Sequence, residues 1–125
     1  MSTLWKGSVL LTLGALAALV AAVAAFGGAA RGTALTNDAV SAGKPSEFRF
    51  TLAKKTAAKG TVVFKVTNKG SINHDFKIAG KKTAQIKPGK SVTLRVVFRK
   101  AGKFPYMCTL PGHAPAGMKG IFTVR

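Results

Sequence analysis

Acidic residues and cysteine are both scarce in this 125-residue chain. Its carboxylate side chains are Asp38, Glu47 and Asp75, and Cys108 is the one cysteine. So few carboxylates argue against a hydrolase that needs two of them, and against a calcium site built from many oxygen ligands. A single cysteine excludes an internal disulfide and a zinc site made mainly of thiolates. The length is that of one ordinary domain.

Positive charge, in contrast, is abundant. The 20 Lys and Arg residues give a formal net charge of +17, and residues 31–125 alone carry +16. Nucleic acid is the usual partner of so basic a chain, but these lysines are spread over the expected strands and turns, with few aromatic residues between them. We therefore expect no nucleic-acid binding. Steering toward an acidic redox protein or an anionic membrane surface fits better, and a merely solvated basic surface is the alternative.

The first 30 residues are strongly apolar. Residues 7–30 contain no charge, follow Lys6 and end in small residues, a pattern typical of a secretory signal. The run is also long enough to span a bilayer, so an uncleaved membrane anchor is a second interpretation. Either one predicts an exported protein, in the periplasm or on the outer face of the cytoplasmic membrane.

The rest of the chain has the pattern of a β domain. Residues 31–45 are small and polar, without a sustained period, and we interpret them as a linker. Within residues 46–125, apolar and polar side chains alternate along 48–52, 62–67 and 92–99. Alternation with period two is typical of strands that turn one face to a core. Turn signals separate these segments, so we predict an all-β antiparallel sandwich or barrel.

Four residues suggest chemistry: His74, Cys108, His113 and Met118. They include the single cysteine and both histidines of the chain, and three of them lie within residues 108–118, which are rich in Gly and Pro. Each alone has an ordinary structural explanation, as a buried thiol, a core methionine or a solvated imidazole. Their concentration makes a shared site the better interpretation.

Strand parity predicts that the ligands converge. His74 shares its strand face with the apolar Phe76, and Cys108 shares its face with Phe104 and Tyr106. Both side chains would then point inward. Two imidazoles, a thiolate and a weak thioether form the trigonal set with a long axial ligand that is expected of blue copper. We therefore predict one mononuclear copper ion that cycles between Cu(I) and Cu(II).

These motifs resemble those of the cupredoxins, the small blue copper proteins. Residues 106–113 (YMCTLPGH) and 117–120 (GMKG) resemble the ligand loop of that family, and residues 73–76 (NHDF) resemble the strand that carries its first histidine. The resemblance covers roughly residues 46–125. It implies a Greek-key sandwich of seven or eight strands, with copper near one end.

The resemblance also implies a supporting role for Asp75 and Thr109. In the family, the residue after the first histidine hydrogen-bonds the loop that follows the cysteine, and Thr109 is the matching partner here. An Asp in that place could accept the same bonds and favour oxidised copper. The alternative is that Asp75, opposite in parity to His74, pairs with a surface lysine.

The function implied by the resemblance is electron transfer without a bond to a substrate. The second histidine would reach a partner redox protein through an uncharged face, and an acidic partner would fit the basic chain. We also expect a monomer. We expect no enzymatic activity, because no acid–base pair is evident. A copper chaperone, scavenger or resistance factor of the same fold is the alternative, and an accessory domain of a membrane complex is a third hypothesis. The predicted docking residues around His113 are Leu110, Pro111, Ala114, Pro115 and Ala116.

Overall fold

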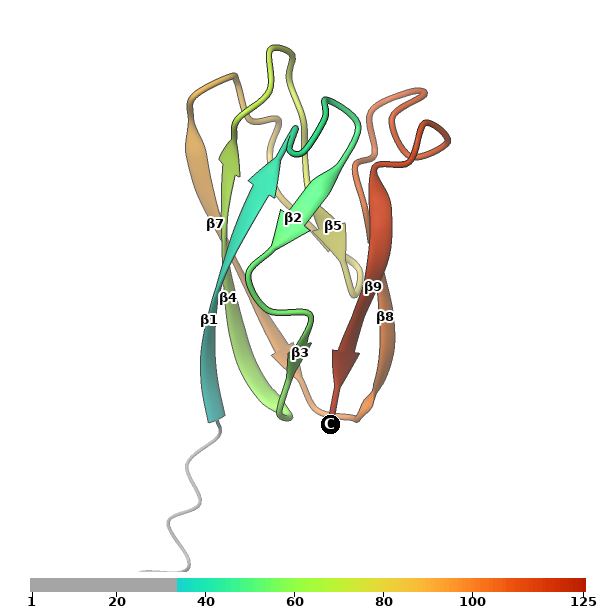
Figure 1. Ribbon diagram of the computed structural model, residues 1–125. Helices are drawn as coiled ribbons and strands as arrows, with labels where there is room; N and C mark the ends of the chain where they lie inside the picture. The colour runs from blue at the N-terminus through green and yellow to red at the C-terminus, as the bar shows by residue number, and fades with distance from the viewer. Residues whose placement is uncertain (1–33) are drawn as a thin grey trace, which may run out of the picture. The chain divides into compact units, whose positions relative to one another are not determined.

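The computed structural model describes residues 34–125, which form two facing β-sheets (Figure 1). One sheet contains, in spatial order, β2 (Phe50–Leu52), β1 (Ala34–Ala42), β4 (Gly60–Asn68) and β7 (Ser91–Phe98). The other contains β3 (Thr56–Ala57), β9 (Lys119–Val124), β8 (Gly102–Met107), β5 (Lys77–Ile78) and β6 (Lys81–Lys82). The predicted all-β sandwich is confirmed, with nine strands over these residues.

No helix within residues 34–125 has the length and apolar character needed to cross a membrane. The predicted signal or anchor, residues 1–30, lies outside the described residues.

The predicted linker was wrong over most of its length. Residues 34–42 form β1, which pairs in parallel with β4 along its whole length and in antiparallel with β2. Its inward positions are Asp38, Val40 and Ala42, which are 2%, 2% and 0% exposed. One of these is charged and another is small, so the apolar alternation that marks the other strands is hidden in this one. The domain therefore begins before residue 46.

The alternation predicted for the other long strands is confirmed. On β4, Val62, Phe64 and Val66 are fully buried, while Lys65 between them is exposed. Burial of such side chains is the main favourable term in folding, at about 25 cal/mol per Å² of apolar surface. The core between the sheets also includes Leu52, Phe76, Ile78, Ile86, Val96, Phe98, Tyr106, Phe122 and Val124.

Asn68 holds the loops at one end of the sandwich. Its buried side-chain amide donates to the carbonyl oxygens of Ile72 and Ile86, at 2.7 Å each, and its Oδ1 accepts from Gly70 N. Ile86 in turn forms an antiparallel bridge with His74. The turn at residues 68–70 is thus tied to the segment that carries His74, at the top of Figure 1.

Asp38 is a buried carboxylate within the sandwich. Its Oδ1 accepts from Lys54 N at 2.8 Å, whereas its Oδ2 has no hydrogen-bond partner among the described residues. Burial raises the pKa of Asp38 above its ordinary value, and the bond and charge of Lys54 oppose that rise. A raised pKa means that the folded state binds this proton more tightly than the unfolded state does.

We therefore expect Asp38→Asn to stabilise the protein at pH 7, by about 1 kcal/mol in free energy of unfolding. The amide keeps the oxygen that accepts from Lys54 N and removes the cost of a buried charge. The wild type loses stability as pH rises through the pKa of Asp38, so the advantage should shrink below about pH 4, where the carboxyl is protonated. Urea unfolding at both pH values measures this, and a variant less stable than wild type at pH 7 contradicts it.

Candidate metal centre

Three predicted ligands converge at the end of the sandwich that carries the long loops. The Nδ1 atom of His113 lies 3.2 Å from His74 Nδ1 and 3.4 Å from Cys108 Sγ. The three donor atoms fall within 4.8 Å of one another. His74 and Cys108 are fully buried, and His113 is half-buried. Residues far apart in the sequence thus bring their donor atoms to one point.

Glu47 fixes the tautomer of His74. Its Oε1 lies 2.7 Å from His74 Nε2. The pKa of Glu47 is lowered to about 2, mainly by a hydrogen bond from the Ser71 backbone and next by one from the Ser71 hydroxyl. The carboxylate is therefore ionised and can only accept hydrogen bonds. The proton of a neutral His74 is therefore on Nε2, and Nδ1 keeps its lone pair for a metal ion. Sequence analysis missed this role, since nothing local links residues 27 positions apart.

Gly70 makes room for this contact. A Cβ added at Gly70 would lie 2.2 Å from Glu47 Oε1 and 3.0 Å from His74 Nε2. The carboxylate is also held by Ser71, whose backbone N–H donates to Glu47 Oε2 at 3.0 Å and whose hydroxyl donates at 2.8 Å. A side chain at position 70 would displace the carboxylate from His74.

The two residues after Glu47 contact the rest of the centre. The Phe48 ring packs edge-on against the imidazole of His113, with ring centroids 5.0 Å apart. Arg49 donates from its guanidinium to the carbonyl oxygen of Gly117, at 3.3 Å, in the loop before Met118. One short segment therefore supports both histidines and the ligand loop.

Asp75 is bonded to the loop after the cysteine. It is 2% exposed, and its Oδ1 accepts from Thr109 N at 2.6 Å. The Thr109 hydroxyl donates to Oδ2, and Asp75 N donates to Cys108 Sγ at 3.4 Å. These bonds match the arrangement implied by the family resemblance, and within residues 34–125 Asp75 forms no ion pair with a lysine.

Met118 closes the ligand loop. Its carbonyl oxygen accepts from Cys108 N at 3.0 Å, and its own N–H donates to the carbonyl oxygen of His113 at 3.1 Å. The Met118 side chain is fully buried. The backbone thus links three of the four predicted ligands directly, and it holds Met118 beside the cysteine and the second histidine.

Burial also sets the acid–base state of the donors. It raises the pKa of the Cys108 thiol, and it lowers the pKa of the His113 imidazole, which the neighbouring His74 lowers further. Metal binding must therefore displace a proton from the thiol, while His113 is already neutral at pH 7.

The donor geometry fits a single metal ion. Two nitrogens at about 2.0–2.1 Å from one ion lie no more than about 4.2 Å apart, and a nitrogen and a sulfur no more than about 4.4 Å. The 3.2 Å between the two histidine nitrogens and the 3.4 Å from His113 Nδ1 to Cys108 Sγ lie within these limits, and all three donors lie within 4.8 Å of one another. Two facing Nδ1 lone pairs repel each other unless a proton or a cation lies between them. Imidazole and thiolate together suit copper.

A family model for copper-binding proteins of the plastocyanin/azurin family matches residues 36–125. The chain belongs to this family. It is a cupredoxin, as its ligand motifs indicated, and its metal is copper, which His74, Cys108 and His113 are positioned to bind.

Solved structures support the same fold. Auracyanin A from the photosynthetic bacterium Chloroflexus aurantiacus aligns with a TM-score of 0.61 at 18% identity, over 74% of this chain and 100% of that one. Rusticyanin from Thiobacillus ferrooxidans aligns with a TM-score of 0.61 at 22% identity, over 73% of this chain and 77% of that one.

A curated relative matches a shorter stretch. The copper-resistant cuproprotein CopI of Pseudomonas aeruginosa is 45% identical over 40 residues, which are 32% of this chain. This chain therefore spans 22% of the length of that relative.

The predicted docking residues of the cupredoxin are not all accessible. Pro111, Pro115 and Ala116 are exposed, and Leu110 is partly buried against the core. Ala114 is 8% exposed, so its inclusion was wrong. The loop folds back through tight turns, one of which is closed by a hydrogen bond from Gly117 N to the carbonyl oxygen of Ala114, and these turns direct the Ala114 side chain inward.

We expect Gly70→Ala to weaken Cu(II) binding by roughly 10-fold to 100-fold, the usual cost of losing a partner of a ligating histidine. The added methyl group would occupy the position of Glu47 Oε1 and break its bond to His74. Competition with a chelator measures the affinity, and the nitrogen chemical shifts of His74 report its tautomer.

Ser71→Ala is the matched control, because it removes one donor to Glu47 and leaves the Glu47–His74 contact in place. If Gly70→Ala bound copper as tightly as this control, Glu47 would have no part in positioning His74.

Proposed function

We propose that the chain is an exported one-electron carrier. The proposal is that His74, Cys108 and His113 would hold one copper ion and that the Met118 thioether would be a fourth, weak donor. The observation that supports it best is the buried donor set, which the protein holds in place through Glu47 and the ligand loop. Copper, when bound, supplies the Cu(I)/Cu(II) couple, so an electron can be gained or lost without a bond to a substrate.

The residues around the donors limit the change in structure that gain or loss of an electron would cause. His74 and Cys108 are 0% exposed, which keeps water from replacing them. The N–H of Asp75 donates to Cys108 Sγ and disperses negative charge on the sulfur. Because these partners are backbone groups or buried side chains, they need not move when the charge of the site changes.

We also propose that the site has no enzymatic activity. Catalytic turnover would require a proton donor or acceptor that can reach a substrate. Within residues 34–125, each carboxylate near the donors is already engaged, Asp75 with Thr109 and Glu47 with Ser71 and His74. In this part of the chain, neither carboxylate beside the donors is left without a hydrogen-bond partner, which does not favour acid–base catalysis.

The electron would pass through the ring of His113 to a partner at the uncharged face. Exposed Pro111, Pro115 and Ala116 lie in the same loop, and Phe48, which is 36% exposed, packs on the His113 ring. We propose this surface as the contact with a redox partner. Export rests on the apolar segment of residues 7–30.

Titration of the purified chain with Cu(II), followed by visible spectroscopy and a redox cycle, tests the carrier function. We expect an intense blue band that saturates at one copper per chain, because a single cysteine allows a single thiolate site. The band should bleach on reduction and return on oxidation. Weak colour with tight Cu(I) binding and ready transfer to a chelator would contradict it.

Ligand variants test the individual roles. Cys108→Ser should abolish the blue band, since the band requires the thiolate. Met118→Leu should keep the band and raise the reduction potential, because the weak axial donor to Cu(II) is lost. Visible spectra and voltammetry measure both effects, and a blue Cys108→Ser protein would refute the ligand assignment.

Copper handling is the second candidate. The matched stretch of the copper-resistant cuproprotein CopI supports it, since that name places a related sequence in copper resistance. Such a protein would pass on the ion instead of an electron. The same titration separates the two, because a handling protein gives up Cu(I) to a competing chelator while a carrier keeps it through repeated redox cycles.

A further inference from the structure

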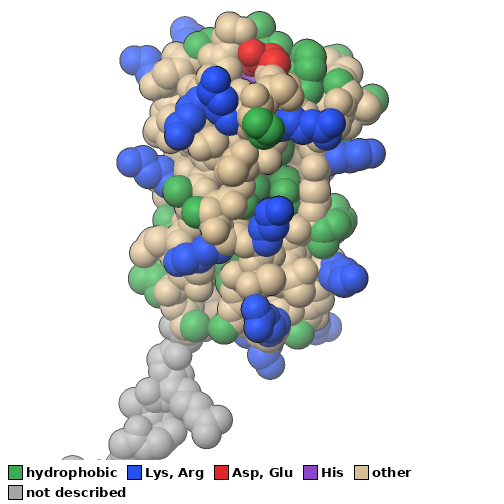
Figure 2. Space-filling view, viewed as in Figure 1, with side chains coloured by type: hydrophobic (Ala, Val, Ile, Leu, Met, Phe, Trp, Pro, Cys, Tyr) green, Lys and Arg blue, Asp and Glu red, His purple; other side chains and the backbone are tan. Residues whose placement is uncertain are grey.

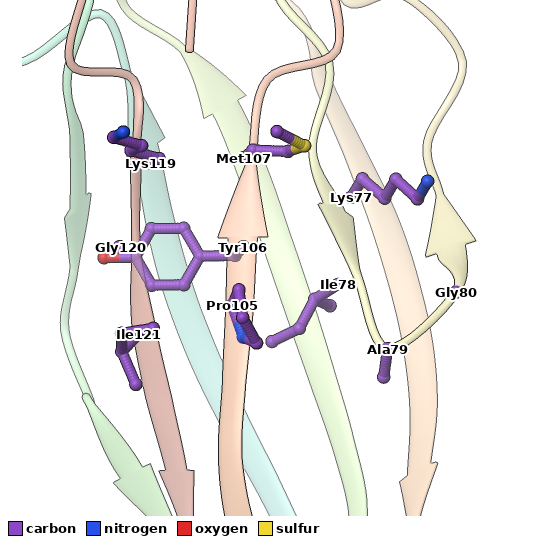
Figure 3. A pocket seen from close by; sticks show the side chains of 10 residues that line it. All are labelled: Lys77, Ile78, Ala79, Gly80, Pro105, Tyr106, Met107, Lys119, Gly120 and Ile121. Carbon is purple, nitrogen blue, oxygen red and sulfur yellow. The ribbon is translucent and has the colours of Figure 1, made fainter. Parts of the chain in front are cut away.

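An apolar depression lies on the outer face of the sheet that contains β5, β8 and β9. Figure 3 shows the side chains that line it, and its volume is about 740 Å³. Ile121 and Met107, two of the exposed large apolar side chains of the molecule, contribute to it at 49% and 39% exposure. We call this depression the lateral groove and define it by Lys77, Ile78, Pro105, Met107, Lys119 and Ile121.

Lysines flank this groove because of the strand register. Lys77 pairs with Met107, and Met107 pairs with Lys119, so the three lie in one row across β5, β8 and β9 (Figure 3). Lys82 on β6 is opposite Lys77 and extends the row. Directly paired residues of antiparallel strands share a face. Two lysines therefore flank an exposed methionine, a third follows in the same row, and the apolar Pro105 is the next residue on this face of β8.

No acidic side chain balances these lysines. The chain has three carboxylates: Asp38 is buried on β1 of the other sheet, Asp75 is bonded to Thr109, and Glu47 contacts His74. In the view of Figure 2 the acidic atoms gather at one end of the molecule, whereas Lys and Arg extend along its length. By the strand register and the lining residues, the groove has lysines at its edge and an apolar floor.

We propose that the lateral groove binds an acidic protein partner, which places an apolar side chain on Pro105 and Ile121 and its carboxylates beside Lys77 and Lys119. Apolar burial and opposite charge at one place give both affinity and a defined orientation. A membrane surface fits the groove less well, because a concave surface accommodates a protruding side chain better than it accommodates a flat bilayer. That this partner is a redox protein rests on the proposed function.

The groove lies close to the proposed ligands along the chain. Met107 precedes Cys108 directly, and its partner Lys119 follows Met118. A protein bound here would contact residues one covalent step from two of the proposed ligands. The surface around His113 lies on the ligand loop instead, so the chain would offer two separate contact surfaces near one centre.

The test uses the copper-loaded, reduced chain and the synthetic peptide Glu-Glu-Leu-Glu-Glu as the probe. We expect its addition to shift the NMR signals of Lys77, Met107, Lys119 and Ile121. Replacement of the central Leu by Ser should weaken binding. Shifts confined to the loop of residues 109–117 would overturn the proposal. Peptide binding tests the groove, and the copper titration described above tests the carrier function. The two measurements are separate, so failure of one claim can be told from failure of the other.

Charge reversal supplies the matched comparison. Lys77→Glu with Lys119→Glu should weaken peptide binding by about tenfold or more, since like charges then face each other. Lys65→Glu with Arg95→Glu makes the same change in net charge at exposed positions of the other sheet and should have little effect.

Equal losses in both double variants would show attraction to net charge alone and would overturn the site. Vesicles of phosphatidylglycerol and phosphatidylcholine are the competing probe. If they shift the groove signals and the peptide does not, the partner is a membrane and the proposal is wrong.

Discussion

The structure depends on holding three electron-pair donors close together inside a protein. Two imidazole nitrogens lie 3.2 Å apart and a sulfur lies 3.4 Å from one of them, so their lone pairs would repel one another wherever no proton or cation lies between them. The contacts that oppose this come from different parts of the fold. Glu47 orients His74, Asp75 and Thr109 join the two ligand segments, and backbone bonds fix the ligand loop. A metal ion therefore meets a site whose shape is largely set in advance.

The same arrangement determines the charge of the surface. All three carboxylates are engaged within the fold or at the metal centre, so none is left to balance the lysines on the strands. The outcome is a small domain with uncharged, exposed Pro111, Pro115 and Ala116 in the loop of His113 and a basic, partly apolar side face. Long-range attraction of an acidic partner follows from this distribution, independently of the chemistry of the centre.

Much of the fold and the donor set could be predicted because both leave local traces. Strands such as β4 show an apolar–polar alternation of period two. The single cysteine and both histidines of the chain belong to the predicted ligand set, so a chance grouping was a poor explanation. β1 was missed because Asp38 occupies one of its inward positions. Strand parity also failed at Asp75, since only a single bridge, at His74, precedes β5 and the backbone is not a regular strand there.

Other features of the centre had no trace in the sequence. Glu47 and Gly70 meet through folding of segments far apart in the chain, and neither has a distinctive local pattern. The inward turn of Ala114 depends on the hydrogen bonds within its loop. Contacts of this kind depend on tertiary structure, so composition and periodicity cannot show them.

X-ray absorption spectroscopy of the copper-loaded chain, in both oxidation states, tests the central claim most directly. If the protein holds the donors in place, two nitrogen ligands and one sulfur ligand at short distances should be found in oxidised and reduced forms alike. Loss of a histidine or gain of an oxygen ligand on reduction would contradict a preformed site suited to electron transfer.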